Sequence, residues 1–174
     1  MIRGYMAQSA DGYVADEAGS VAFLDDFKGA ETGFADFFAE IDTVVMGRKT
    51  YDQIVSFGVE WPYAGKHGIV VSSFPLTTVL GDVEPWSGGL DSLIKRLEEN
   101  KKGDCWVVGG PCLQAAFIEN GWMQRLQLFI VPVLLGAGIE LFPSEAGAIR
   151  MQVASVNTLA DGIVELDYRM AYGQ

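Results

Sequence analysis

Two stretches decide the fold of this chain: Val44-Val45-Met46-Gly47-Arg48-Lys49-Thr50-Tyr51 and Cys105-Trp106-Val107-Val108-Gly109-Gly110-Pro111. Each is an apolar run that stops at glycine and gives way to a helical pattern. Nearly continuous apolar runs are typical of parallel strands that are covered on both faces. Ligands of open α/β sheets bind beyond the carboxyl ends of the strands, so the two glycine turns predict one shared site.

Strands and helices alternate through the first two-thirds of the chain. The apolar spacing predicts strands at 2–8, 43–46, 68–72, 105–108 and 126–134, and helices at 33–41, 49–55, from 90 onward and at 111–120. Thr32 is expected to cap the first helix, and Asp161-Gly162 predicts a β-hairpin formed by 151–159 and 163–172. We therefore expect an α/β fold as one domain over 1–174, with a mostly parallel central sheet, helices on both faces and an antiparallel C-terminal hairpin.

The charge of the chain restricts its partners. The formal net charge is −11, which repels nucleic-acid phosphates and anionic membranes. The first residues show no signal-peptide core and the apolar run at 126–135 is too short for a bilayer, so we expect a cytoplasmic protein. A single histidine, His67, excludes a His-rich metal site, and the spacing of Cys105 and Cys112 matches no zinc pattern, so no metal is expected.

A local cluster of cations can still bind an anionic small molecule. Gly47 allows close backbone approach, the following helix start offers free N–H groups, and Arg48, Lys49 and Thr50 add two charges and a hydroxyl. Gly109-Gly110 repeats the arrangement, and Ser72-Ser73 ends a third predicted strand. The competing interpretation is that these are solvated helix residues and ordinary turns. The two turns together favour a diphosphate or a ribose phosphate.

Four segments in order carry a resemblance to a known family. The Met-Gly-Arg-Lys-Thr and Gly-Gly motifs are similar to those of the dihydrofolate reductase superfamily. The Val131–Gly138 segment resembles, within it, the reductase domain of the riboflavin-biosynthesis deaminase-reductase and its stand-alone relatives. The four segments are Ser9–Ala15, Val44–Tyr51, Val107–Pro111 and Val131–Gly138.

This resemblance implies NADPH as hydride donor and a homodimer, for which the apolar C-terminal strands could form the interface. By motif position, it implies that phosphates are held by the first turn, with Arg48 and a serine near the 2′-phosphate. It further implies that the second turn lies under the diphosphate and the nicotinamide, whose covering loop follows the first strand. The cofactor-binding residues so implied are Ala7, Gly12, Gly47, Arg48, Lys49, Thr50, Ser72, Ser73, Gly109, Gly110, Cys112 and Leu113.

Dihydrofolate reductases also place one catalytic carboxylate on the helix before the Met-Gly-Arg strand. Asp36 and Glu31 are the candidates for this role here, although each could equally be a surface acid, which is the interpretation we favour for Glu40. Asp11 is expected to fix its turn rather than to transfer protons. Trp61-Pro62-Tyr63 could either wall a substrate pocket or anchor a loop.

The leading interpretation is an NADPH-dependent reductase that transfers hydride to a C=N or C=O carbon of a small heterocyclic or ribosyl substrate. A second interpretation is the 5-amino-6-(5-phosphoribosylamino)uracil reductase of riboflavin biosynthesis; because no zinc deaminase signature occurs, the chain would be the reductase half only. The motifs are also compatible with a dihydrofolate reductase and with a nucleotide-binding protein that has no catalytic activity.

Overall fold

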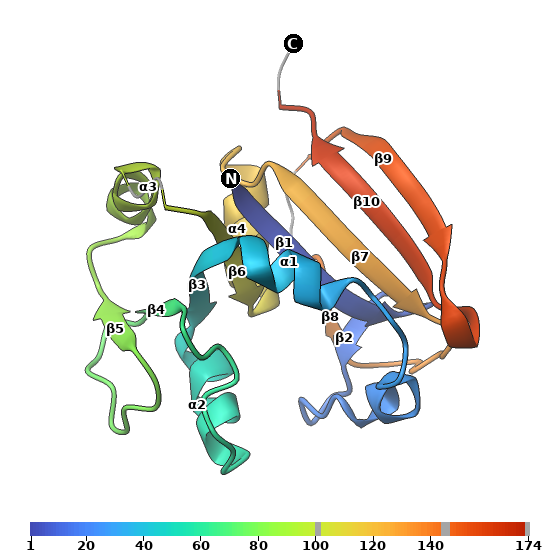
Figure 1. Ribbon diagram of the computed structural model, residues 1–174, viewed down its shortest axis with the longest axis horizontal. Helices are drawn as coiled ribbons and strands as arrows, with labels where there is room; N and C mark the ends of the chain where they lie inside the picture. Colours follow the sequence, from blue (N-terminus) through green and yellow to red (C-terminus); the bar gives the residue numbers. More distant parts are fainter. Residues whose placement is uncertain (100–101, 144–146, 173–174) are drawn as a thin grey trace.

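The computed structural model describes residues 1–99, 102–143 and 147–172, and its centre is an eight-stranded sheet (Figure 1). Six strands run parallel in the order β5-β4-β3-β6-β1-β7, and the antiparallel pair β10-β9 completes the sheet. The predicted fold class is thereby confirmed. The strands are β1 (Ile2–Ser9), β3 (Ile41–Gly47), β4 (His67–Val71), β5 (Val83–Trp86), β6 (Asp104–Gly109), β7 (Arg125–Val131), β9 (Met151–Thr158) and β10 (Val164–Met170).

Helices cover both faces of the parallel strands. α1 (Phe34–Glu40) and α2 (Arg48–Ser56) pack on the face that holds Val44, whereas α3 (Leu90–Glu99) and α4 (Pro111–Glu119) pack on the face that holds Val45. Both valines are fully buried, which explains why the strand is apolar without alternation. Burying each such side chain contributes about 1.5–3 kcal/mol.

The start of α1 differs from the sequence-based expectation. The N-cap is Gly33, with a positive φ of 70°, and no side chain caps the helix. The Thr32 carbonyl instead accepts a hydrogen bond of 2.9 Å from the Tyr5 hydroxyl. The expected Thr32 cap is therefore wrong, because the left-handed turn at Gly33 ends the preceding loop one residue later.

A small second sheet was not predicted. It pairs β2 (Tyr13–Ala15) with β8 (Ile139–Glu140), two segments that lie more than 120 residues apart in the sequence. Two short 3-10 helices, η1 (Ala22–Phe27) and η2 (Ala160–Gly162), complete the described elements. In the described parts of the chain, no helix is long and apolar enough to span a membrane.

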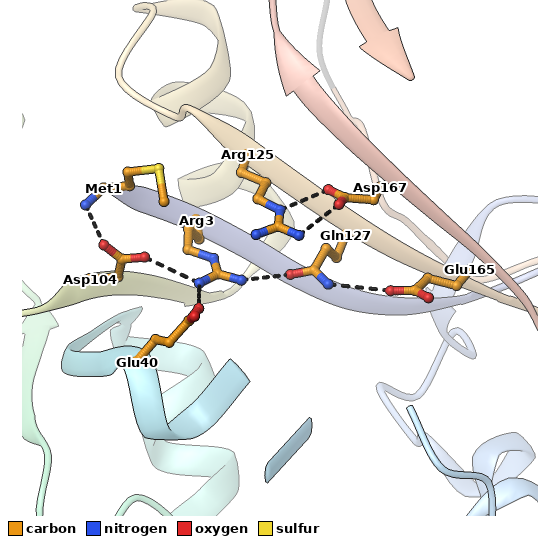
Figure 2. A network of polar contacts seen from close by, with 8 residues as sticks. All are labelled: Met1, Arg3, Glu40, Asp104, Arg125, Gln127, Glu165 and Asp167. Atoms are coloured by element: carbon orange, nitrogen blue, oxygen red, sulfur yellow. Dashed lines mark hydrogen bonds and ion pairs between the residues drawn. The ribbon is translucent and has the colours of Figure 1, made fainter. Parts of the chain in front are cut away.

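A polar network fixes the amino-terminal ends of the central strands (Figure 2). Arg3 is only 2% exposed, and its guanidinium donates to Glu40, to Asp104 at 3.1 Å and to Gln127 at 2.9 Å. Gln127 donates in turn to Glu165, and Arg125 pairs with Asp167 beside it. A buried charge is tolerated only when it is paired in this way. The network ties α1, β1, β6, β7 and β10 together at this edge.

Candidate functional site

The two glycine turns lie side by side at the opposite, carboxyl edge of the sheet. β3 and β6 are hydrogen-bonded neighbours, with Met46 paired to Gly109. A Cβ placed on Gly47 would lie 3.8 Å from the Gly110 nitrogen, and one on Gly110 would lie 3.4 Å from Thr50 Oγ1. Gly47, Gly109 and Gly110 thus form one backbone surface without side chains of their own, with the Thr50 side chain beside it.

The carboxyl ends of β3 and β6 form a topological switch point of the sheet. From β3 the chain passes through α2 to β4, whereas from β6 it passes through α4 to β7 on the other side. Because α2 and α4 cover opposite faces, their N-termini flank the crevice between the two strands. Neither helix has a side-chain cap, so first-turn N–H groups of α2 are available to an anion. In α4, Pro111 has no N–H and Leu113 donates to the Gly110 carbonyl at 2.9 Å, which leaves the Cys112 N–H.

A cavity of about 710 Å³ opens at this point. Eight of the residues implied as cofactor-binding line it, which are Gly47, Arg48, Lys49, Thr50, Gly109, Gly110, Cys112 and Leu113. The rest of the lining is mostly apolar and comes from β1, β2, β4, β6, β8, α2, α3, α4 and the loops beside them. These residues are Met6, Val14, Ala15, Gly19, Val21, Gln53, Val71, Leu90, Val108, Pro111, Ala116, Ile139 and Pro143.

The two cations of the first turn are engaged differently. Arg48 Nε donates to both carboxylate oxygens of Asp52, at 2.7 and 2.8 Å, and Nη1 donates to the Pro75 carbonyl at 2.9 Å. Lys49 is exposed and forms no ion pair with any residue that the structure describes. Arg48 therefore holds the segment after β4 in place, while the Lys49 ammonium is available to a ligand.

Four residues implied by the resemblance do not line this cavity. Ala7 packs with Phe129 on the other face of β1, since Met6 takes the cavity side. Ser72 Oγ donates to the Phe74 carbonyl at 2.7 Å and shapes the turn after β4, with Ser73 exposed beside it. Gly12 forms the turn between β1 and β2, with a φ of 92°.

Asp11 fastens one wall of the cavity. Its carboxylate accepts hydrogen bonds from Ser9 Oγ at 2.6 Å, Gly136 N at 2.7 Å and Leu135 N at 3.1 Å. The Ser9 hydroxyl, followed by the two backbone N–H groups, lowers the pKa of this carboxyl. The turn between β1 and β2 is thereby tied to the segment after β7. Asp11 has the structural role that its Asp-Gly sequence predicts.

Gly138 brings the two strands of this wall together. A Cβ at this position would lie closer than 3.0 Å to the Ala15 carbonyl oxygen, so no other residue fits without displacing the backbone. β2 and β8 then place Val14, Ala15 and Ile139 against the cavity. Sequence reasoning missed these three residues. The glycines of the Val131–Gly138 segment were the signal that could have indicated them.

The candidate acids lie elsewhere. Glu31 and Asp36 border a separate hollow of about 370 Å³ beside the amino-terminal ends of β1 and β7, together with Glu40 and Glu165. This hollow shares no described lining residue with the cavity, and no described residue of the cavity lining is a carboxylate.

The Tyr5 ring separates α1 from the sheet, where it stacks on Phe37 with ring centroids 4.3 Å apart. Burial raises the pKa of its hydroxyl to about 12.

The loop aromatic residues serve as an anchor. Trp61 packs edge-on against Tyr51 and Tyr63, with ring centroids 6.1 and 5.0 Å away. A Cβ on Gly81 would collide with the Trp61 ring, which shows how tightly it is enclosed. Neither Trp61 nor Tyr63 lines the cavity. Of the two interpretations of this segment, the structure supports the loop anchor.

A shallow groove continues the cavity outward. It has a volume of about 1050 Å³ and runs between α2 and the 18–28 segment. Phe57, Leu24, Lys28 and Asp25 line it, and Lys28 pairs with Asp25 at 2.8 Å. The cavity and the groove are continuous because they share Gly19, Val21, Lys49, Gln53 and Ile139.

Known proteins are similar to this chain in sequence or in structure. The chain is 30% identical over 165 residues to the uncharacterized protein YwjB of Bacillus subtilis, covering 94% of each chain. A crystal structure of a proposed riboflavin biosynthesis protein from Shewanella sp. PV-4 superposes with a TM-score of 0.88 at 26% identity, covering 98% of each chain.

A more distant similarity concerns a bifunctional enzyme. The diaminohydroxyphosphoribosylaminopyrimidine deaminase/5-amino-6-(5-phosphoribosylamino)uracil reductase of Thermotoga maritima superposes with a TM-score of 0.75 at 14% identity. The match covers 98% of this chain and 56% of the enzyme, and at this identity it shows the fold alone. The sequence profile of the RibD C-terminal domain matches residues 76–165, which is 90 of the 174 residues. The chain therefore belongs to the RibD C-terminal domain family and has its dihydrofolate reductase-like fold.

Proposed function

We propose that this protein is an NADPH-dependent reductase that transfers hydride to a C=N or C=O carbon of a small heterocyclic or ribosyl substrate. The observation that carries the proposal is the side-chain-free surface of Gly47, Gly109 and Gly110 between two uncapped helix N-termini. A bound NADPH would supply the hydride. A diphosphate could approach the backbone closely here, because none of these three glycines carries a Cβ.

The chain's own residues would bind and orient the two reactants. The first-turn N–H groups of α2 and the Cys112 N–H of α4, together with Lys49, would hold the phosphates. The apolar wall of Val14, Ala15 and Ile139 would exclude water from the reacting end. Arg48 would act beside the 2′-phosphate from its place between Asp52 and the Pro75 carbonyl.

The substrate would enter through the groove beside α2. Hydride transfer needs the acceptor carbon in contact with the nicotinamide, so the substrate site must be continuous with the cofactor cavity. The groove meets this requirement through its five shared residues, whereas the hollow of Glu31 and Asp36 shares none. The proton that accompanies the hydride would come from a bound water, since no described lining residue of the cavity is a carboxylate and Asp25, which lines the groove, is paired with Lys28 at 2.8 Å.

Two competing functions can be weighed on this basis. The placement of Asp36 and Glu31 outside the cavity disfavours dihydrofolate reduction. The riboflavin-pathway reductase is favoured as the second candidate by the family membership and by the names of the Shewanella and Thermotoga proteins.

Two free cysteines, Cys105 and Cys112, fit a reducing cytoplasm as the place of the reaction.

Cofactor titration tests the proposal directly. We expect NADPH to quench the tryptophan fluorescence of the wild type at micromolar concentration. Gly47→Ala should weaken binding at least tenfold while leaving the melting temperature unchanged, because its backbone is extended and its new methyl meets only ordinary contacts. Gly147→Ala is the matched control, since it lies away from the cavity lining and its methyl would meet nothing within 4 Å. Equal NADPH affinity of all three proteins would refute the cofactor site.

Turnover separates the remaining functions. We expect loss of the near-ultraviolet absorbance of NADPH with 5-amino-6-(5-phosphoribosylamino)uracil-type substrates or their ribosyl analogues, and none with dihydrofolate. Consumption with dihydrofolate would overturn the assignment of the acids. Tight NADPH binding without oxidation by any C=N or C=O substrate would support a protein that only binds the nucleotide.

A further inference from the structure

Gln53 lies where the cavity meets the groove. It is one of the five residues that line both, and Lys49 is the only other one of the five with a polar side chain. The remaining three, Gly19, Val21 and Ile139, offer no side-chain hydrogen bond. Gln53 follows Lys49 by four positions in α2, so both side chains lie on the same face of the helix.

One hydrogen bond fixes the orientation of the Gln53 amide. Its Nε2 donates to the Gly19 carbonyl at 2.7 Å. This carbonyl belongs to a turn in which Asp16 Oδ1 accepts hydrogen bonds from the N–H groups of Ala18 and Ser20, at 2.9 and 2.8 Å. A carbonyl oxygen can only accept, so the NH₂ group of Gln53 must face the turn and Oε1 must face away from it.

The Oε1 atom of Gln53 is an acceptor that a ligand can use. In the parts of the chain that the structure describes, no donor bonds to this atom, and the side chain is exposed. Ser56 also lines the groove, but its hydroxyl donates to the Gln53 backbone carbonyl at 2.6 Å. Because the bond to Gly19 already orders the amide, a donor that binds to Oε1 meets a group with little conformational freedom left to lose.

We propose that Gln53 determines substrate specificity, because its Oε1 accepts a hydrogen bond from an N–H or O–H group beside the reducible carbon. The inference rests on the proposed function, which places that carbon where the groove meets the cavity. Val21 and Ile139 can pack against a ring at this place but cannot distinguish its hydrogen-bonding groups. Lys49 has donors alone, so it selects for an acceptor. The substrate class is therefore a heterocycle whose C=O or C=N carbon has a hydrogen-bond donor next to it.

A matched pair of aldehydes tests the proposal. Pyrrole-2-carboxaldehyde has a ring N–H beside the carbon that carries the C=O group, and 1-methylpyrrole-2-carboxaldehyde has a methyl group in place of this hydrogen. Binding to the complex with NADP⁺ is measured by calorimetry, and reduction by NADPH oxidation. We expect Gln53→Met to weaken the N–H compound relative to the N-methyl compound roughly five- to tenfold, as one lost hydrogen bond implies.

Two properties of the variants make this comparison specific. Gln53→Met should keep the wild-type melting temperature, because the side chain is exposed and methionine has a helix propensity similar to that of glutamine. Gln152→Met is the matched control, since it is the same exchange at an exposed position of β9 that lines neither the cavity nor the groove. It should keep the wild-type preference between the two aldehydes.

Gln53→Glu separates a contact with the substrate from an effect on the turn. The carboxylate keeps an acceptor oxygen but cannot donate to the Gly19 carbonyl, so we expect it to retain the preference for the N–H compound. If Gln53→Glu loses the preference as Gln53→Met does, the amide acts through the turn and the proposal is wrong. Equal preference in the wild type and Gln53→Met would contradict it as well. With normal NADPH binding these results contradict the Gln53 inference alone, whereas a wild type that does not bind NADPH contradicts the proposed function.

Discussion

Replacing Gly138 by alanine should weaken cofactor binding from a position outside the cavity. The new methyl would lie closer than 3.0 Å to the Ala15 carbonyl oxygen, so β2 and β8 must move apart. Overpacking of this kind costs about 1–3 kcal/mol. In the free variant the wall with Ala15 and Ile139 can stay displaced and avoid the clash. Binding of NADPH requires the wall to return to its place, so this free energy is subtracted from the free energy of binding. At about 1.4 kcal/mol per tenfold, the NADPH dissociation constant should rise roughly 5- to 150-fold.

The assay is a titration of NADPH into the wild type, Gly138→Ala and the control Gly147→Ala, whose methyl meets no atom within 4 Å. Hydrogen exchange at 13–15 should speed up in Gly138→Ala, because these amides lose their strand partner. The central sheet should keep its protection, since β2 and β8 are not part of it. Unchanged exchange at 13–15 together with wild-type affinity would refute the reasoning that the wall is rigid and closes the site.

Three further results are expected. Arg3→Met should lower the free energy of unfolding in urea by about 1–3 kcal/mol, because the buried Gln127 and the partly buried Asp104 lose their hydrogen-bond donor. Glu40→Gln should cost less, since the Glu40 side chain is 61% exposed. The Ser9 hydroxyl and two backbone N–H groups lower the pKa of Asp11, so its stabilisation is present at neutral pH. The melting-temperature gap between the wild type and Asp11→Asn should therefore close as the pH falls below the ordinary value of 3.8 and through the lowered pKa. A thiol reagent should label Cys112 alone in the native protein, and NADPH should slow the reaction; burial of Cys105 raises its pKa to about 12, so it should react only on unfolding.

Short sequence patterns were enough to predict the strands and helix starts that meet at the carboxyl ends of β3 and β6. Val44 and Val45 face opposite layers, so the strand shows an unbroken apolar run that needs no partner to be recognised. Gly47 and Gly110 stop their strands and begin helices within the same few residues. Helix ends were less predictable, as the Gly33 cap shows, because a left-handed turn competed with the threonine before it.

The wall of the cavity could not be predicted, since it depends on contacts between distant segments. β2 has three residues and β8 has two, which is too short for a periodic pattern. Their pairing depends on Asp11 bonding to Leu135 and Gly136, across more than 120 positions of sequence. The glycine at position 138 is visible in the sequence. The reason for it, the close approach of the Ala15 carbonyl, becomes visible only in the structure.

The candidate acids are a second example of a placement that the sequence could not predict. Asp36 belongs to the helix on which a catalytic carboxylate was expected, so its sequence position fits the role. Asp36 borders the hollow beside the amino-terminal end of β1, and the Tyr5 ring stacks on its neighbour Phe37. Helical spacing predicts the face of the helix on which a residue lies. It does not predict whether that face packs near the amino-terminal or the carboxyl ends of the strands. The proposed hydride transfer consequently needs its proton from a source other than this helix.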